Sequence, residues 1–348
     1  MRVCIIGAGA IGGMLGARLA LAGEQVTFVE KNREHANAIR SAGLTVEAEG
    51  ETIVARDVAV TEVVGDAGEQ DLVIIAVKAH QIPLLLPDIR QLFGPRTMVM
   101  TVQNGIPWWY FFKHGGPFDG RTIAAVDPDG FIDRHIERDR IIGCIVYPAG
   151  EVVAPGVVRV VEGNRFSVGE LDGAKSERVE ALSQLLVRAG FKSYVLEDIR
   201  SEIWLKLWGN LSFNPISALT HGTLAGICRN PRTRSLAAAM MAEAQQIGEK
   251  LGIVFRHTIE KRIAGAESVG EHKTSMLQDV EAGRPLEIGA LVGAVVELGA
   301  LTETPTPHID AIYAAVSLLN ETLVRRGASA NGAAESGTAS TGGTSVRA

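Results

Sequence analysis

This 348-residue sequence has few cysteines, no long apolar run and no excess of positive charge. Its three cysteines, Cys4, Cys144 and Cys228, stand far apart, with no CxxC pair and no neighbouring histidine, which argues against a disulfide framework or a zinc site and suits a reducing compartment. No stretch approaches the roughly 18–20 uncharged apolar residues of a membrane span. The net charge of −6 gives no reason to expect nucleic acid or an anionic membrane as a partner.

The first residues, MRVCIIGAGAIGGMLGARLALAG, combine a basic start, an apolar run and small residues, as a signal peptide does. The run is rich in glycine rather than leucine, however, and Arg18 interrupts it. We therefore expect a cytoplasmic protein, and the length allows two domains.

Short apolar strands alternate with helical segments in the first part of the chain. Residues 3–6, 25–30, 71–77 and 96–102 read as strands, and a helical pattern follows the first of them through Leu21. This alternation predicts an α/β, Rossmann-type doubly wound domain over residues 1–197. Later in that domain we expect loops at 106–140, a helix at 176–190, and strands at 140–150, 156–163, 166–170 and 192–196.

Long helical patterns dominate the second part of the chain, at 200–219, 233–251, 256–282, 287–301 and 306–326. They predict an all-α C-terminal domain over residues 198–326. Residues 327–348 are rich in Gly, Ser, Ala and Thr with almost no large apolar residue, so they cannot bury a core, and we expect a disordered tail.

A glycine-rich segment follows the first expected strand. Its G-x-G-x-x-G pattern lies between that strand and a helix, and the second strand ends in an acidic residue. The first glycine permits a tight turn, the second lets the backbone approach a pyrophosphate, and the third lets the helix pack closely. A close-packed turn without a nucleotide is the alternative. The residues expected to hold a dinucleotide are Gly7, Ala8, Gly9, Ala10, Ile11 and Gly12.

Glu30 ends the second expected strand. A carboxylate there accepts hydrogen bonds from the ribose hydroxyls and repels the 2′-phosphate of NADP, so it favours NAD. Lys31 and Arg33 follow at once, and they would hold that phosphate if Glu30 turned away. The sequence thus predicts an NAD(P)H cofactor, with Glu30 favouring NAD.

The stretch EIWLKLWGNLSFNPISAL, residues 202–219, reads as an apolar helix with a narrow polar seam. Lys206, Asn210 and Asn214 are four residues apart and so lie on one face of a helix. Because a surface helix has a wide polar face instead, we expect this helix to be mostly buried, with the seam facing a site. Pro215 should kink or end it. The simpler alternative is a Glu202–Lys206 pair, with the seam in water.

With these features the chain resembles the ketopantoate reductase (2-dehydropantoate 2-reductase) family over about residues 1–325. The matching pieces are GAGAIGG at 7–13, AVKAHQ at 76–81, VQNG at 102–105, the Lys206 helix, and SMLQDVEAGRPLEI at 275–288. The resemblance implies a C-terminal domain like that of 6-phosphogluconate dehydrogenase. It also implies reduction of a small 2-keto acid, most directly 2-dehydropantoate to pantoate in pantothenate biosynthesis. NADP is the family's usual cofactor, no metal is expected, and the oligomeric state is open, a homodimer included.

The resemblance implies roles for individual residues. Lys206 is the general acid that protonates the alkoxide formed by hydride transfer, and Asn210 orients the lysine and the substrate oxygen. Asn214 and Ser275 bind the substrate. Asn104 lies between the substrate and the nicotinamide.

Lys78, Ala149 and Glu287 match positions that contact the cofactor, Glu287 at the ribose or at the substrate hydroxyl. Most of these residues have a plain structural alternative. In that alternative Lys78 is a solvated charge at a strand end, and Glu287 stabilises the start of a helix. Ser275 is then a helix cap, and Asn104 belongs to an ordinary Asn-Gly turn.

Two departures from the family concern the substrate. HKTS at 272–275 replaces a polar Asn-Ile-Ser-Ser-like stretch, and Leu224 stands where an asparagine is expected. Together with the aromatic run 108–112, which we also expect near the substrate, they favour a bulkier or less polar 2-keto acid. An NAD-dependent dehydrogenase of such a 2-hydroxy acid is therefore an alternative on the same fold. A non-catalytic dinucleotide-binding redox sensor is another, although a sensor needs no proton donor.

Overall fold

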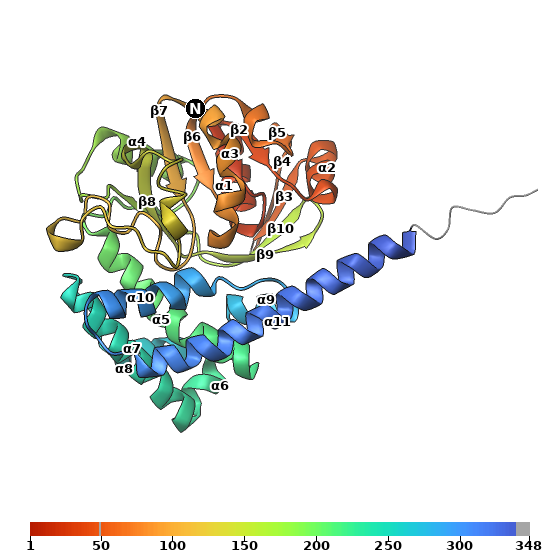
Figure 1. The fold of residues 1–348 in the computed structure, drawn as a ribbon. Coiled ribbons are helices and arrows are strands. Elements are labelled where there is room, and N and C mark those ends of the chain that lie inside the picture. The colour runs from red at the N-terminus through yellow and green to blue at the C-terminus, as the bar shows by residue number, and fades with distance from the viewer. Residues whose placement is uncertain (49, 339–348) are drawn as a thin grey trace, which may run out of the picture. The chain divides into compact units, whose positions relative to one another are not determined.

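The computed structural model describes residues 1–48 and 50–338, with only the backbone described for 328–338. The chain divides into two compact units, with the division between Trp204 and Leu205. Figure 1 shows the helices and strands with the labels used below.

The first unit is built on a seven-stranded sheet with the order β11-β8-β7-β6-β1-β2-β5. All neighbours are parallel except β11, which runs antiparallel to β8. From β1 the chain first adds strands on one side and then returns to add β6, β7 and β8 on the other. This reversal between β1 and β6 is the switch point of a doubly wound sheet. The strands are β1 Arg2–Ile6, β2 Gln25–Val29, β5 Val58–Thr61, β6 Gln70–Ile75, β7 Phe93–Thr101, β8 Ile141–Val146 and β11 Phe166–Gly169.

The central strands are apolar along their whole length because both faces of this sheet are covered. In β1, Val3 to Ile6 are at most 1% exposed. The helices of this unit are α1 Ala10–Leu21, α2 Arg33–Ala42, α3 Leu86–Ile89 and α4 Glu177–Arg188. The predicted doubly wound α/β fold is confirmed.

A second sheet, which the sequence did not reveal, has the order β4-β3-β10-β9. It packs on α1, since a Cβ at Gly13 would lie 3.2 Å from both Leu44 Cδ2 and Val158 Cγ1. Its strands are β3 Leu44–Ala48, β4 Glu51–Ala55, β9 Ala149–Ala154 and β10 Val157–Glu162.

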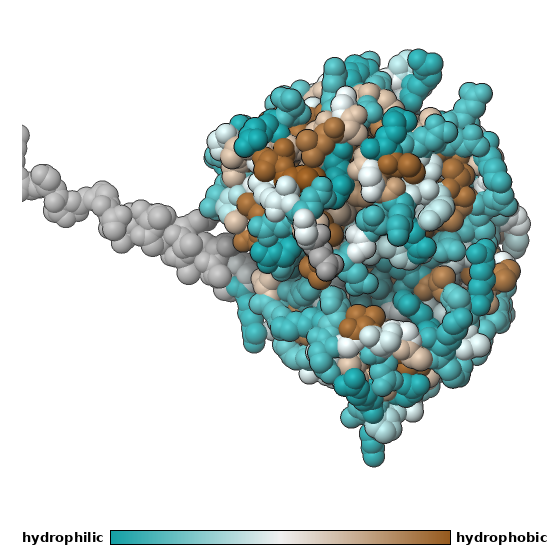
Figure 2. Space-filling view, turned by 180° about the vertical axis from the view of Figure 1, so that it is seen from behind, coloured by the Kyte–Doolittle hydropathy of each residue, from teal (hydrophilic) through white to brown (hydrophobic). Residues whose placement is uncertain are grey.

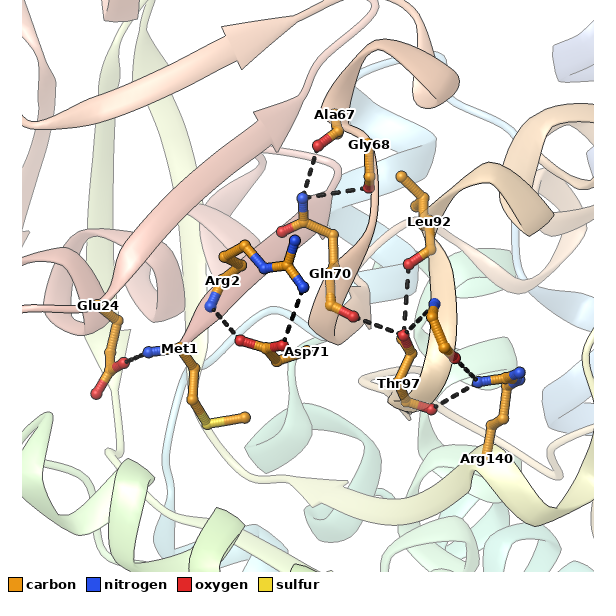
Figure 3. Close-up of polar contacts among 11 residues, drawn as sticks. Met1, Arg2, Glu24, Ala67, Gly68, Gln70, Asp71, Leu92, Thr97 and Arg140 are labelled. Carbon is orange, nitrogen blue, oxygen red and sulfur yellow. Dashed lines mark hydrogen bonds and ion pairs between the residues drawn. The ribbon is translucent and has the colours of Figure 1, made fainter.

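At the amino-terminal edge of the large sheet, polar contacts join the starts of the strands (Figure 3). The Arg2 N–H donates to Asp71 at 2.8 Å, and the Thr97 hydroxyl donates to the Gln70 carbonyl at 2.5 Å. Polar groups at this edge thus bond to one another. The carboxyl edge of the sheet, at the opposite ends of the strands, is the better candidate for a ligand site.

The second unit is helical, as predicted. Its core includes Leu207, Trp208, Met240, Met241 and Leu298, each at most 1% exposed. None of the helices within the described residues is long and apolar enough to cross a membrane. The helices are α5 Ile199–Thr220, which begins in the first unit, α6 Leu224–Arg229, α7 Pro231–Lys250, α8 Ile259–Ser268, α9 Ser275–Glu281, the π-helix η7 Gly289–Gly293, α10 Ala294–Leu301 and α11 Pro307–Thr338.

Several sequence-based expectations about these elements were wrong. Residues 192–196 form two isolated bridges, with Arg165 and Val168, in place of a strand, although backbone bonds such as that from the Val168 N–H to the Tyr194 carbonyl join them to β11. The helix expected at 256–282 is two helices, since Gly270 takes a φ of +86° and Thr274 caps α9. Of the two outcomes expected at Pro215, a kink or an end of the helix, the end does not occur, because α5 continues to Thr220.

Helix α11 also continues into the stretch for which we expected disorder. Its backbone is helical as far as Thr338, where alanines favour the helix even without large apolar side chains. Residues 339–348 of the expected tail lie outside the described residues.

On the face drawn in Figure 2, the hydrophobic residues seen are interrupted by hydrophilic ones. That face therefore presents no continuous apolar surface among the described residues visible there.

Candidate functional site

The carboxyl edge of the large sheet brings together four of the predicted positions. Gly7 follows β1, Glu30 follows β2, Lys78 stands three residues after β6, and Asn104 stands three residues after β7. Because β2, β1, β6 and β7 are adjacent and parallel, these residues share one edge. In doubly wound sheets this edge, at the switch point, is where ligands bind.

The glycine-rich loop has the geometry of a phosphate cradle. Gly7 has a φ of +98°, which a residue with a Cβ rarely adopts, and a Cβ there would lie 2.9 Å from the Ala76 carbonyl oxygen. A Cβ at Gly12 would overlap the Gly7 carbonyl oxygen and lie 2.8 Å from the Ala76 side chain. Gly9, the N-cap of α1, has no atom within 4 Å of its Cβ position, so the helix N-terminus is open to a ligand. The residues present therefore fit a dinucleotide.

Glu30 is half-buried and holds the loop from one side. Its Oε2 accepts the Ala8 N–H at 2.9 Å, and its Oε1 accepts the Asn32 N–H at 2.8 Å. Each carboxylate oxygen has a second lone pair, so both retain an acceptor site for a ribose hydroxyl. The two bonds to the backbone fix the carboxylate at the end of β2.

The two basic residues after Glu30 differ in their contacts. Arg33 is paired with Glu62, with 3.1 Å between Nε and Oε2. Lys31 is exposed. The guanidinium that would hold a 2′-phosphate is thus engaged by a carboxylate.

Lys78 and Ala149 start local structures in the same unit. Lys78 is the N-cap of the 3₁₀-helix η2 Ala79–Leu84, and its backbone N–H donates to Gln81 Oε1 at 3.1 Å. Ala149 opens β9 and pairs with Glu162 of β10. Asn104 is half-buried, and the next residue, Gly105, has a φ of +87°, as an Asn-Gly turn requires.

Helix α5 has the predicted polar seam. Trp208 and Leu211 are fully buried, and the Trp208 indole N–H donates to the Met241 carbonyl at 2.7 Å. Lys206 and Asn210 are half-buried, and Asn214 is 6% exposed. The seam is therefore partly or wholly buried, which argues against the reading of a solvated face.

A cation that the sequence reading missed lies beside this helix. A Cβ at Gly209 would lie 3.1 Å from Cζ of Arg262, so the guanidinium packs against the backbone of α5 one residue before Asn210. No motif marks Arg262, because its place depends on the packing of α8.

Ser275 and Glu287 lie at the starts of helical segments in the second unit. The cap of α9 is Thr274, whose hydroxyl accepts the Leu277 N–H, so Ser275 is not the cap and stays exposed. Glu287 is half-buried, and its carbonyl accepts the Leu291 N–H at 3.2 Å in an α-helical turn; the π-helix η7 begins two residues after it. Single π-turns of this kind are frequent at functional sites.

The aromatic run 108–112 does not line a pocket, contrary to our expectation. All five side chains are at most 2% exposed. The Trp109 indole donates to the Thr101 hydroxyl, and Arg200 donates to the Tyr110 and Phe112 carbonyls at 2.8 and 2.6 Å. The run is part of the core of the first unit, because aromatic rings bury large apolar areas.

The other two departures from the family pattern lie side by side. The Leu224 N–H at the start of α6 donates to the His272 carbonyl at 3.0 Å. Both residues are half-buried. Sequence positions 48 residues apart thus form one local surface.

Tyr147 is a half-buried polar residue of the first unit. Its hydroxyl donates to Glu202 Oε2 at 3.0 Å, and the Arg165 guanidinium lies 3.6 Å over its ring. Burial, and next the charge of Glu202, raise the pKa of Tyr147 to about 12, so it remains a donor at neutral pH. Among the described residues, no group of three or more His, Cys, Asp or Glu side chains is placed to hold a metal ion.

Comparisons with known proteins cover both units. Family models described as "Ketopantoate reductase PanE/ApbA" and its C-terminal part match residues 3–173 and 198–320. A 2-dehydropantoate 2-reductase of Mesorhizobium japonicum is 53% identical over 321 residues, which are 92% of this chain and 98% of that protein. A solved Ralstonia solanacearum protein described as a ketopantoate reductase is 41% identical, with a TM-score of 0.87 and coverage of 92% and 98%. The structure of D-mandelate dehydrogenase with NADH and anilino(oxo)acetate, 23% identical with a TM-score of 0.78 and coverage of 93% and 99%, shares the fold.

Proposed function

The chain belongs to the ketopantoate reductase family, and on that premise we propose that it reduces 2-dehydropantoate to pantoate with a nicotinamide dinucleotide. The observation that carries the proposal is the identity with the Mesorhizobium enzyme over nearly the whole chain. The open N-terminus of α1 would bind the pyrophosphate of the cofactor. The half-buried Lys206 of α5 would donate the proton that the reaction needs.

The loop from Gly7 to Gly12 and the carboxylate of Glu30 would hold the dinucleotide. The loop would bind the pyrophosphate through backbone N–H groups, and Glu30 would bind the ribose. We assign Lys78, Ala149 and Glu287 to further cofactor contacts. When bound, the reduced nicotinamide supplies a hydride to the keto carbon of the substrate.

Lys206 would give its Nζ proton to the substrate oxygen as negative charge develops there. An ammonium beside that oxygen both stabilises the charge and removes it by proton transfer, which is general acid catalysis. Asn210 lies one helical turn after Lys206 and would orient the lysine and the substrate oxygen toward each other. Asn214, Ser275 and Asn104 would bind the rest of the substrate.

We further propose a preference for NADH. Glu30 is fixed by its two backbone bonds at the end of β2, where it would repel a 2′-phosphate. Arg33, one of the two basic residues that would compensate, forms an exposed ion pair with Glu62 that competes with a 2′-phosphate.

Identification of the product tests the reaction. Purified protein incubated with 2-dehydropantoate and NADH or NADPH should yield pantoate by mass spectrometry. Lys206→Ala should yield almost none, whereas Lys261→Ala, which removes an exposed lysine of α8, should behave as the parent. Absence of pantoate with both cofactors would contradict the proposal.

A second candidate is an NAD-dependent dehydrogenase of another, less polar 2-hydroxy acid. The observation that favours it is the Leu224–His272 pair, which replaces two amide groups that the family pattern leads us to expect. A panel of 2-keto acids that share the C1 carboxylate and the C2 carbonyl but differ in their side chains separates the two candidates. The acid reduced with the largest kcat/KM identifies the substrate class.

A further inference from the structure

One buried histidine of the first unit touches the glycine-rich loop. His35 lies in the first turn of α2 and is 6% exposed. Its Nε2 is 2.9 Å from the Ala8 carbonyl oxygen, and its Nδ1 is 2.9 Å from the Gly156 backbone nitrogen. A carbonyl oxygen only accepts and a backbone N–H only donates, so Nε2 carries the proton and Nδ1 accepts. The two partners thus define the tautomer of the ring.

The bond to Ala8 has a consequence for the next peptide. In a planar trans peptide the C=O and the N–H point in opposite directions. When His35 holds the Ala8 carbonyl, the Gly9 N–H is directed away from His35. The Ala8 N–H is held in turn by Glu30, so the backbone of Ala8 is fixed on both sides. Gly9 caps α1 and faces open space, where a phosphate would bind.

The other partner of His35 belongs to the small sheet. Gly156 lies in the turn between β9 and β10, with a φ of +75°. Its carbonyl accepts the Thr45 N–H at 2.9 Å, and a Cβ on it would lie 3.0 Å from the Ala38 Cβ of α2. At the other end of β9, a Cβ on Gly150 would lie 3.3 Å from the Ala10 Cβ. The turn is therefore held in place, and the small sheet supports the loop from two points.

We propose that His35 is the positioning residue of the cofactor loop: it transmits the fixed position of the β9–β10 turn to the Ala8 carbonyl and so aims the Gly9 N–H at the pyrophosphate of the dinucleotide. This inference rests on the proposed function, because it takes the loop to be the dinucleotide site. It assigns the small sheet a part in cofactor binding.

Two substitutions separate the bonds of His35. His35→Gln can place an amide N–H near the position of Nε2 and keeps the donor to Ala8. His35→Asn is shorter, so its amide oxygen can replace Nδ1 as acceptor for Gly156 while the Ala8 carbonyl loses its donor. Each variant leaves one backbone group without its partner, so a merely structural role predicts similar losses of thermal stability and similar NADH binding.

The assay is NADH binding by fluorescence titration, alongside Tm and kcat at saturating NADH. We expect His35→Asn to raise the Kd for NADH about 10-fold with kcat changed less than about threefold, and His35→Gln to stay within about threefold of the parent. Equal Kd values for both variants and the parent would overturn the inference while leaving the proposed function intact. If the parent itself binds neither NADH nor NADPH, both the inference and the proposed function fail.

A measurement on the unmodified protein covers the case in which both variants fail to fold. Histidine-selective ¹⁵N labelling reports the tautomer of His35 and the proton on Nε2. A phosphate accepting from the Gly9 N–H polarises the Ala8–Gly9 peptide and strengthens the bond from Nε2 to the Ala8 carbonyl. We expect that proton to shift downfield when NADH is added. An unchanged resonance at saturating NADH would overturn the inference.

Discussion

Replacement of Glu30 by alanine should reverse the preference between the two nicotinamide cofactors. In the parent the carboxylate is half-buried and fixed by the N–H groups of Ala8 and Asn32. Two ribose hydroxyls bonded to an ionised acceptor contribute about 1.5 kcal/mol each, so their loss weakens NADH by about 100-fold. A carboxylate about 5 Å from a 2′-phosphate costs about 3 kcal/mol per unit of phosphate charge at an effective dielectric constant near 20, and solvent reduces this. Its removal should strengthen NADPH by about 10-fold.

The assay is the ratio of kcat/KM for NADH to that for NADPH, which should fall by about 1,000-fold in Glu30→Ala. Glu34→Ala is the matched control, because it removes the same charge from an exposed site in the first turn of α2. Its ratio should stay within about threefold of the parent. An unchanged ratio in Glu30→Ala, or an equal change in both variants, would show that Glu30 is not at the ribose.

Three further predictions address the proton donor, the core and the cysteines. Lys206→Ala should bind NADH as the parent does and lose about 10³-fold in kcat, measured by titration and steady-state kinetics; a loss below 10-fold would exclude it as the general acid. Arg200→Met leaves the carbonyls that it bonds without a donor and should lower the free energy of unfolding by about 3 kcal/mol in urea. Arg188→Met is the control, because this exposed arginine makes a long contact, 3.8 Å, with Glu24; it should change that free energy by less than about 0.5 kcal/mol. All three cysteines are buried, and burial raises the pKa of Cys4 to about 12, so a thiol reagent at pH 8 should react within minutes only after unfolding; rapid reaction of the folded protein would contradict this.

The sequence predicts the elements whose pattern is complete over a short stretch. The β1–α1–β2 unit is recognisable because an apolar strand, three spaced glycines and an acid occur within 30 residues. The seam of α5 is recognisable because three polar residues recur every four positions in an apolar segment. The small sheet is not, because β3 and β4 are five residues long and partly exposed, and β3 pairs with β10, which follows about 100 residues later.

The residues that the sequence did not single out depend on tertiary contacts. His35 has its two partners 27 and 121 residues away, so no local pattern marks it. Arg262 reaches Gly209 only through the packing of two helices. The aromatic run 108–112 was misread for the same reason: composition alone does not distinguish rings that fill a core from rings that line a pocket.

The measurement that tests the central claim most directly is the initial rate of 2-dehydropantoate reduction, with NADH and NADPH in parallel on the purified protein. We expect turnover with both cofactors, the larger kcat/KM with NADH, and loss of both rates in Lys206→Ala. No turnover with either cofactor, while NADH still binds, would contradict the substrate assignment and direct the search to less polar 2-keto acids.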